Sequence, residues 1–167
     1  MIYVCSLHEM RRHVRSLRPG YLVSLVQSEF QPPTPAEIEA DSHHRVVVDD
    51  VSEPGLGAVV PEQEHVQEMV TFLAQRSRDE GVLIHCYAGI SRSTAAALIA
   101  LSLDMDGREM EAAQTLRRAA PHAQPNRRII ALADQILGRQ GRLVGAREAM
   151  GRATPAHEGQ LVTLESP

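Results

Sequence analysis

Residues 82–103 constrain the fold more than any other part of this 167-residue chain. They begin with a short strand pattern at 82–85 whose first three residues are apolar, pass through a loop that contains Gly89, and end in a stretch at 93–103 that is apolar on nearly every side. A helix that is apolar all round is buried on most of its surface. A short, wholly apolar strand is typical of a sheet that is covered on both faces. This segment therefore predicts a strand, a loop and a helix at the centre of a layered domain.

Strand and helix patterns alternate along the rest of the chain. Short apolar runs predict strands, and apolar residues at 3.6-residue spacing predict helices. The expected strands are 2–5, 21–26 and 45–49, and the expected helices are 6–18, 127–137 and one that begins at Pro61. Proline and glycine predict loops at 31–42 and 52–60, the second of them mobile. This alternation predicts an α/β fold in three layers, with a central, mostly parallel sheet flanked by helices.

Glycine and proline interrupt every pattern after residue 138. A chain of this length has room for one hydrophobic core. We therefore expect one domain over residues 1–138. Residues 139–167 are expected to form a C-terminal extension, with a helical turn or two and then a frayed tail.

The basic residues are 17 arginines and no lysine. This composition excludes lysine Schiff-base chemistry, the P-loop lysine of nucleoside triphosphatases and the strand lysine of protein kinases. The formal net charge is −4, and the aromatic residues are three tyrosines, two phenylalanines and no tryptophan. Nucleic-acid binding favours clustered positive charge and aromatic stacking surfaces. We therefore expect that this chain does not bind nucleic acid.

The two cysteines, Cys5 and Cys86, lie far apart in the sequence, and no CxxC pair indicates a zinc site or a redox dithiol. No apolar run reaches the roughly 18 residues of a membrane-spanning helix, and the N-terminal apolar run is too short for a signal peptide. We therefore expect a cytoplasmic protein with reduced thiols and without a metal, a cofactor or a membrane span. The sequence leaves the oligomeric state open.

The segment VLIHCYAGISRSTA at 82–95 places a cysteine at the end of a strand and an arginine at the start of a helix. This end of a strand is where open α/β sheets bind ligands. The loop turns its backbone N–H groups toward an anion at the helix N-terminus. Gly89 supplies backbone freedom, and Arg92 supplies a planar fork for bidentate phosphate binding. The expected phosphate-binding residues are Tyr87, Ala88, Gly89, Ile90, Ser91 and Arg92.

Cys86 lies at the floor of this expected cradle, where hydrogen-bond donors and the helix dipole favour its thiolate. A thiolate beside a bound phosphate is a nucleophile for phosphoryl transfer. Ser93 can donate a hydrogen bond to the sulfur and stabilise it as a leaving group. His85 is expected to order the loop through its ring rather than to titrate in the reaction.

Residues 85–93, HCYAGISRS, resemble the His-Cys-x5-Arg-Ser signature of the cysteine-based protein tyrosine phosphatases, in the form found in the small dual-specificity branch of bacterial type. The order of elements is compatible with that family over about residues 1–137, and the tail is not covered. The resemblance implies a metal-independent phosphatase that forms a phosphocysteine intermediate. It implies a protein substrate, carrying either phosphotyrosine or a mixture of phosphotyrosine and phosphoserine or phosphothreonine.

The resemblance also implies an aspartate on an upstream loop, first as general acid and then as base for the hydrolytic water. Asp50 is the preferred candidate because it opens the loop, whereas Asp49, the alternative, can still belong to the strand. Pro125-Asn126 resembles a Pro-Asn feature of the same branch, in which the asparagine braces the phosphate loop. Asn126 can also cap the helix that follows it.

Other functions use the same residues. A phospho-binding module with weak or no turnover would use the same cradle, and so would a phosphatase of a small phosphorylated metabolite or lipid. The variable loop positions carry no cation, which favours a phosphoprotein over an inositide as substrate. Sulfur transfer of the rhodanese type is a further alternative, and His85 and the Arg92-Ser93 pair speak against it.

Three remaining features have less specific interpretations. Cys5, in the first expected strand, predicts core packing, with a resolving thiol for Cys86 as the alternative. We interpret the adjacent histidines His43 and His44 as structural or solvated side chains rather than as a metal site. The arginine pairs at 11–12, 117–118 and 127–128 predict solvated helix faces. The alternative is that one pair flanks the pocket and holds an acidic substrate.

Overall fold

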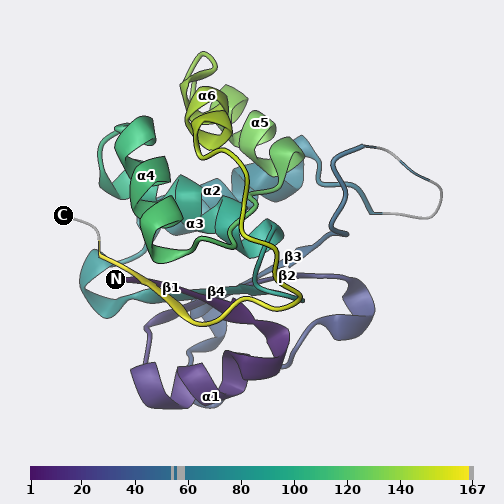
Figure 1. The fold of residues 1–167 in the computed structure, drawn as a ribbon. Helices are drawn as coiled ribbons and strands as arrows, with labels where there is room; N and C mark the ends of the chain where they lie inside the picture. The colour runs from purple at the N-terminus through teal and green to yellow at the C-terminus, as the bar shows by residue number, and fades with distance from the viewer. Residues whose placement is uncertain (54, 56–58, 166–167) are drawn as a thin grey trace.

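Five strands form one sheet at the centre of the structure, in the order β3-β2-β4-β1-β5 (Figure 1). The computed structural model describes residues 1–53, 55 and 59–165. β1 to β4 run parallel, and β5 pairs antiparallel with β1 at the edge of the sheet. The predicted central, mostly parallel sheet is confirmed. The strands are β1 (Ile2–Ser6), β2 (Tyr21–Val26), β3 (His43–Val47), β4 (Val82–Cys86) and β5 (Val162–Leu164).

Helices cover both faces of the sheet, as the three-layer prediction requires. Figure 1 shows α1 (Leu7–Leu17) on one face and α2 to α6 on the other. The second layer consists of α2 (Gln63–Gln75), α3 (Arg92–Asp104), α4 (Glu109–Ala119), α5 (Arg127–Ile136) and α6 (Arg142–Ala149). Short 3-10 helices occupy Ser28–Phe30, Ala40–Ser42 and Arg78–Glu80. Within the described ranges, no helix is long and apolar enough to cross a bilayer.

α3 lies at the centre of the larger helical layer. Every residue from Ala95 to Leu101 is fully buried, which confirms the expected all-round burial of this helix. Its four alanines in this stretch present little side-chain bulk, so the helix packs closely on β1 and β4. The packing fixes the direction in which the N-terminus of α3 meets the end of β4.

The third strand begins and ends earlier than the predicted 45–49. His43 and His44 pair with Leu22 and Val23 of β2, so the strand starts at His43. Asp49 lies beyond the strand, because its N–H donates to the Val59 carbonyl oxygen (2.8 Å) and its carboxylate accepts from the Val59 N–H (2.6 Å). The predicted mobile loop at 52–60 falls in part on residues 54 and 56–58, which lie outside the described residues.

The C-terminal residues do not form the frayed tail that their glycines predict. After α6 the chain returns to the sheet as β5, where Val162 and Leu164 are buried and Thr163 is exposed. This two-residue alternation is typical of a strand, but three residues are too few to stand out in the sequence. Near the same end, the Gly159 N–H donates to the Ala88 carbonyl oxygen (2.8 Å). The extension therefore packs against the sheet and the loop after β4, and the division at residue 138 stays a prediction.

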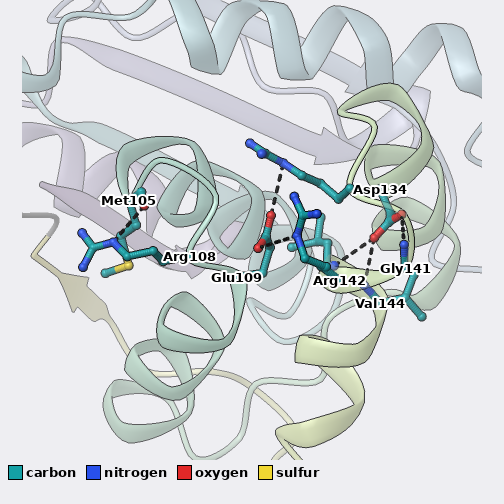
Figure 2. Close-up of polar contacts among 9 residues, drawn as sticks. Met105, Arg108, Glu109, Asp134, Gly141, Arg142 and Val144 are labelled. Carbon is teal, nitrogen blue, oxygen red and sulfur yellow. Dashed lines mark hydrogen bonds and ion pairs between the residues drawn. The ribbon is translucent and has the colours of Figure 1, made fainter.

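A buried carboxylate on α5 caps α6 (Figure 2). Asp134 is 5% exposed and accepts hydrogen bonds from the backbone N–H groups of Gly141 (2.7 Å), Leu143 (2.9 Å) and Val144 (3.3 Å). The first N–H groups of a helix have no partner within the helix. Asp134 supplies that partner from the neighbouring helix, and its negative charge faces the positive end of the helix dipole.

Glu109, the first residue of α4, makes a second contact with the same segment (Figure 2). Its buried carboxylate lies 3.2 Å from Arg139 Nε and 3.4 Å from Arg142 Nε. A buried charge costs free energy unless it is paired, so these two ion pairs fix the chain on either side of Gly141. Glu109 and Asp134 together determine where α6 begins and which way it runs.

We predict that Asp134→Ala lowers the free energy of unfolding by about 1–3 kcal/mol, because the N–H groups at the start of α6 lose their acceptor. The measurement is urea unfolding at neutral pH, with Asp79→Ala as control because Asp79 is exposed. A loss no larger than that of the control would contradict the capping role.

Candidate active site

The carboxyl ends of the parallel strands meet at one edge of the sheet. Ser6 at the end of β1 pairs with Cys86 at the end of β4. Gln27 and Val48, which follow β2 and β3, both accept hydrogen bonds from Arg92. Residues from four strands therefore gather around the loop that joins β4 to α3, at the edge where open α/β sheets bind ligands.

Four carbonyl groups of this loop are bonded to segments that surround it. The Leu7 N–H donates to the Tyr87 carbonyl oxygen, and the Gly159 N–H donates to that of Ala88. The Gln124 N–H donates to the Ile90 carbonyl oxygen, and the Asn126 N–H donates to that of Ser91. In a trans peptide the N–H of the next residue points the opposite way. The N–H groups of residues 88, 89, 91 and 92 are therefore turned toward the inside of the loop.

Gly89 is the residue that allows the loop to close on β1. Its φ is +74°, a conformation that residues with a side chain rarely adopt. A Cβ at this position would lie 2.9 Å from the carbonyl carbon of Cys5 and 2.9 Å from the nitrogen of Ser6. Both the backbone conformation and the close approach to β1 require glycine, as the sequence predicts.

The sulfur of Cys86 lies at the base of the loop and is surrounded by donors. Gly89 N–H donates to Sγ at 3.2 Å, and the Ser93 hydroxyl lies 3.1 Å from Sγ. Cys86 is 1% exposed and Ser93 is fully buried. α3 begins at Arg92 close to the same place, so backbone and hydroxyl donors and the positive end of a helix dipole surround the sulfur.

Arg92 is held by the segments that follow β2 and β3, and its Nε is left without a partner in the described part of the chain. Nη1 donates to the Val48 carbonyl oxygen (2.8 Å) and to Gln27 Oε1 (3.2 Å). The residue is only 3% exposed, and its Nε has no hydrogen-bond acceptor among the described residues. A buried guanidinium without a carboxylate partner is suited to bind an anion.

The structure brings Asp50, but not Asp49, to the loop. Asp50 Oδ1 accepts hydrogen bonds from the Ser91 hydroxyl (2.6 Å) and from Asn126 Nδ2 (3.0 Å). The Asp49 carboxylate instead bonds the Val59 N–H, which closes the base of the following loop. This geometry favours Asp50 over Asp49 as the acid-base candidate.

Asn126 joins three parts of the site. Its side-chain oxygen accepts from the N–H groups of Arg128 and Ile129, both at 3.1 Å, and so caps α5 as the sequence predicts. Its amide nitrogen donates to Asp50, and its backbone N–H donates to the Ser91 carbonyl oxygen (3.2 Å). A two-residue motif in the sequence therefore marks a residue that contacts both the loop and the candidate acid.

His85 is buried behind the loop and bonded on both ring nitrogens. Nδ1 lies 3.4 Å from the Cys86 carbonyl oxygen, and Nε2 lies 2.6 Å from the Ser24 hydroxyl. The same hydroxyl lies 2.8 Å from Nε2 of His43. Burial lowers the pKa of His85 and of His43 to about 4, so both rings are neutral at neutral pH.

The chain of hydrogen bonds continues to the surface. The Thr34 hydroxyl lies 3.0 Å from His43 Nδ1 and accepts from Arg45 Nη2 at 2.8 Å. A neutral histidine ring has one donor and one acceptor nitrogen. Because the Cys86 carbonyl oxygen can only accept, His85 Nδ1 donates to it, and the direction of each bond back to Arg45 follows. Each hydroxyl and ring donates toward Cys86, so the chain holds the His85 ring and, through it, the backbone at the candidate nucleophile.

Cys5 and Cys86 lie on opposite faces of the sheet. Cys5 belongs to the core cluster beneath α1, with Met10, Val14 and Leu83, whereas Cys86 belongs to the cluster beneath α3. Burial raises the pKa of the Cys5 thiol, which favours its neutral form. These surroundings favour the packing interpretation of Cys5 over the resolving thiol.

The sequence patterns did not single out three groups that support the site: the Ser24 hydroxyl, which contacts His85, and Gln27 and the Val48 carbonyl, which contact Arg92. Ser24 is the one polar residue of the strand YLVSLV, and Gln27 follows the end of that strand. A polar residue inside an otherwise apolar strand was the available signal, because a buried hydroxyl needs a partner.

In the described part of the chain, no three His, Cys, Asp or Glu side chains are grouped so that they could hold a metal ion.

No protein-family model matches the chain, and no curated protein matches it in sequence. Its fold does match solved structures. A crystal structure of Cydia pomonella PTP-2 phosphatase matches with a TM-score of 0.63 and 23% identity, over 80% of this chain and 84% of that chain. Human DUSP28 matches with a TM-score of 0.62 and 18% identity, over 83% and 89% of the two chains. PTPMT1 matches with a TM-score of 0.58 and 17% identity, over 85% and 95%.

These matches show that the chain has the three-layer α/β fold of tyrosine and dual-specificity phosphatases. The overlap covers most of both chains in each case. The shared feature is the arrangement of the elements, because the identities are below 25%. What the loop does chemically rests on the residues of this chain.

The buried histidines predict how stability depends on pH. The unfolded chain binds a proton on each near pH 6.5, whereas the folded chain does so only near pH 4. Because the unfolded state binds more protons between these values, the free energy of unfolding falls as the pH is lowered through this window. His43→Gln removes one of the two groups, so we expect a smaller fall than in the wild type.

The measurement compares urea unfolding of both proteins at about pH 7 and about pH 4.5. His8→Gln is the control, because His8 is exposed, and it should keep the wild-type difference. An equal fall in the wild type and in His43→Gln would show that His43 is not held neutral by the fold.

Proposed function

We propose that this protein is a metal-independent phosphatase that hydrolyses phosphate monoesters through a phosphocysteine intermediate on Cys86. The observation that carries this proposal is the environment of the Arg92 guanidinium. Its guanidinium is buried, held on its outer edge by Val48 and Gln27, and without an acceptor for Nε among the described residues. A tetrahedral dianion bound over Cys86 would satisfy it, together with the inward N–H groups of the loop.

In the first step, the Cys86 thiolate forms a bond to phosphorus while the bond from phosphorus to the ester oxygen breaks. Asp50 gives its proton to that oxygen, so the alcohol leaves neutral. The inward N–H groups and Arg92 hold the remaining phosphoryl oxygens, whose charge is spread in the transition state. A guanidinium and backbone dipoles thus carry the charge that a metal ion carries in other phosphatases.

In the second step, water forms a bond to phosphorus while the bond from sulfur to phosphorus breaks. Asp50 now takes a proton from the water, and the Cys86 thiolate and inorganic phosphate are restored. The Ser93 hydroxyl lies 3.1 Å from Sγ, where it can donate to the sulfur as negative charge returns to it. Asn126 and Ser91 position the Asp50 carboxyl for both steps through their hydrogen bonds.

The proposed substrate is a phosphoprotein, with phosphotyrosine as the preferred residue. Two aromatic side chains are exposed at this site: Tyr87 of the loop is 54% exposed, and Phe30, outside the loop, is 40% exposed. Their rings meet edge to face, with centroids 5.2 Å apart. Together with Ala88 they line a cavity of about 380 Å³, where a tyrosine ring could pack. This surface supports an aryl phosphate as substrate.

The direct test is hydrolysis of p-nitrophenyl phosphate by the wild type and by Cys86→Ser. We expect turnover in the wild type, a loss of at least about 10³-fold in the variant, and no effect of a chelator on the wild type. Turnover retained by Cys86→Ser, or abolished by the chelator, would contradict the mechanism. Phosphopeptide binding by a wild type that has no turnover would instead identify a phospho-binding module.

A second prediction separates Asp50 from Asp49. General acid catalysis is worth about 10²–10⁴-fold for a leaving group that needs a proton, and p-nitrophenolate leaves without one. Asp50→Asn should therefore lower kcat/KM far more for an alkyl phosphate or phosphotyrosine than for p-nitrophenyl phosphate. Asp49→Asn is the matched control and should leave that ratio near the wild-type value. The reverse pattern would assign the acid to Asp49.

A further inference from the structure

The segment between α6 and β5 passes beside the loop that joins β4 to α3. We call residues 154–161 the strap, and Figure 1 shows this part of the chain in yellow, on its way from α6 to the sheet. The strap has no helix or strand of its own. Both of its ends are held, because the Thr154 N–H donates to the Pro121 carbonyl oxygen (2.9 Å) and β5 begins at Val162.

Two neighbouring residues of the strap contact the candidate site. The Gly159 N–H donates to the Ala88 carbonyl oxygen of the loop (2.8 Å). The Glu158 carboxylate accepts a hydrogen bond from the Ser6 hydroxyl at the end of β1. Ser6 is the residue of β1 that pairs with Cys86. The strap therefore joins the loop to the strand that lies beside the candidate nucleophile.

Gly159 lies so close to the loop that a larger residue does not fit. A Cβ at this position would lie 2.6 Å from the Gly89 carbonyl oxygen and 2.7 Å from Nε2 of His122. The carbonyl oxygen is a backbone atom, so it can give way only if the loop or the strap moves. Gly89 is itself too close to β1 to carry a Cβ. The middle of the loop is thus enclosed between β1 and the strap, with a glycine at each contact.

The bond from Gly159 reaches the sulfur of Cys86 through a single peptide group. The Ala88 carbonyl and the Gly89 N–H belong to the same planar peptide and point in opposite directions. The carbonyl accepts from Gly159 at 2.8 Å, and the N–H donates to Cys86 Sγ at 3.2 Å. Hydrogen bonds at the two ends of one peptide polarise and strengthen each other. A donor in the strap is therefore coupled to the candidate nucleophile.

This peptide needs an outside partner more than the other peptides of the loop do. Gly89 is the only glycine among residues 87–92, and glycine adopts positive and negative φ about equally readily. Rotation of the peptide that precedes it therefore meets little steric resistance. Rotation would turn the Ala88 carbonyl oxygen inward, where it repels an anion. The Gly159 N–H opposes this rotation, because it bonds that oxygen on the outside of the loop.

We propose that Gly159 is a positioning residue of the reaction, whose N–H holds the Ala88–Gly89 peptide so that the Gly89 N–H stays directed at Cys86 Sγ. This inference rests on the proposed function, in which that sulfur is first the nucleophile and then the leaving group. In the first step, the strap keeps the Ala88 carbonyl oxygen away from the incoming phosphate. In the second step, the Gly89 N–H stabilises the negative charge that returns to the sulfur. The C-terminal extension thus supplies a residue on which the reaction depends.

The first test variant is Gly159→Ala, because its Cβ forces the strap and the loop apart. Removal of one donor to the transition state costs about 10²–10³-fold, and here the donor is displaced rather than removed, so we expect kcat/KM for p-nitrophenyl phosphate to fall at least about tenfold. Gly145→Ala is the matched control. Gly145 lies in α6, where a Cβ meets no neighbour within 4 Å among the described residues. This variant should keep the wild-type kcat/KM.

A second change removes the donor without adding a Cβ. An amide-to-ester exchange at Gly159 replaces its N–H by oxygen, and the chain is made by ligating a synthetic C-terminal peptide to the expressed remainder. We expect kcat/KM to fall at least about threefold, as the loss of one hydrogen bond predicts. The same ligation with the natural amide is the control. Because the ester keeps the size of glycine, it tests the contact even if Gly159→Ala does not fold.

The ¹H–¹⁵N NMR resonance of Gly89 reports the contact in the folded molecules alone. We expect its proton to shift upfield in Gly159→Ala and in the ester, because a weaker hydrogen bond deshields the proton less, and to stay in place in Gly145→Ala. A Gly89 resonance that neither change moves would overturn the contact. A moved resonance with unchanged kcat/KM would overturn the role of Gly159 in the reaction, and both of these outcomes leave the proposed function intact. No turnover of p-nitrophenyl phosphate by the wild type would overturn the proposed function, and this role of Gly159 with it.

Discussion

The candidate site depends on the outward bonding of the loop carbonyls between β4 and α3. The carbonyl oxygens of Tyr87, Ala88, Ile90 and Ser91 are each bonded to a different surrounding segment. Those bonds turn the opposite N–H groups inward, toward Cys86 and the N-terminus of α3. A loop without these contacts would be free to turn its carbonyls inward, which would repel an anion. The rest of the fold can be understood as the means of bringing those four donors to the loop.

The donors come from distant parts of the sequence, which explains why the sequence predicts the loop better than its support. The strand, Gly89, Arg92 and the buried helix are local, and their pattern in residues 82–103 predicts both the fold class and the anion cradle. Leu7, Gln124 and Gly159 meet the loop only through the tertiary fold. Ser24 and His43 likewise reach His85 across neighbouring strands, and no local pattern records strand order. The position of Asp50 at the start of the loop favours it over Asp49, and its bonds to Ser91 and Asn126 give that preference a geometric reason.

The C-terminal extension is likewise ordered by contacts with residues that are distant in the sequence. Its glycines predict fraying, yet Asp134 and Glu109, both on earlier helices, determine the course of α6. β5 then pairs with β1, and Gly159 bonds the loop. Arg147 and Arg152 thereby come to lie beside Arg117 and Arg127, which a helix-by-helix interpretation assigns to solvent. Of the 17 arginines of this chain, one thus lies in the loop and four lie beside it.

The most direct test of the account is to look for the covalent intermediate on Cys86. Wild-type protein mixed with excess p-nitrophenyl phosphate is quenched in acid within milliseconds, digested, and mapped by mass spectrometry. We expect one added phosphoryl group on the peptide that contains Cys86, and none on that peptide in Cys86→Ser. Steady turnover with no phosphoryl group on Cys86 at any quench time, or with the group on another residue, would contradict it.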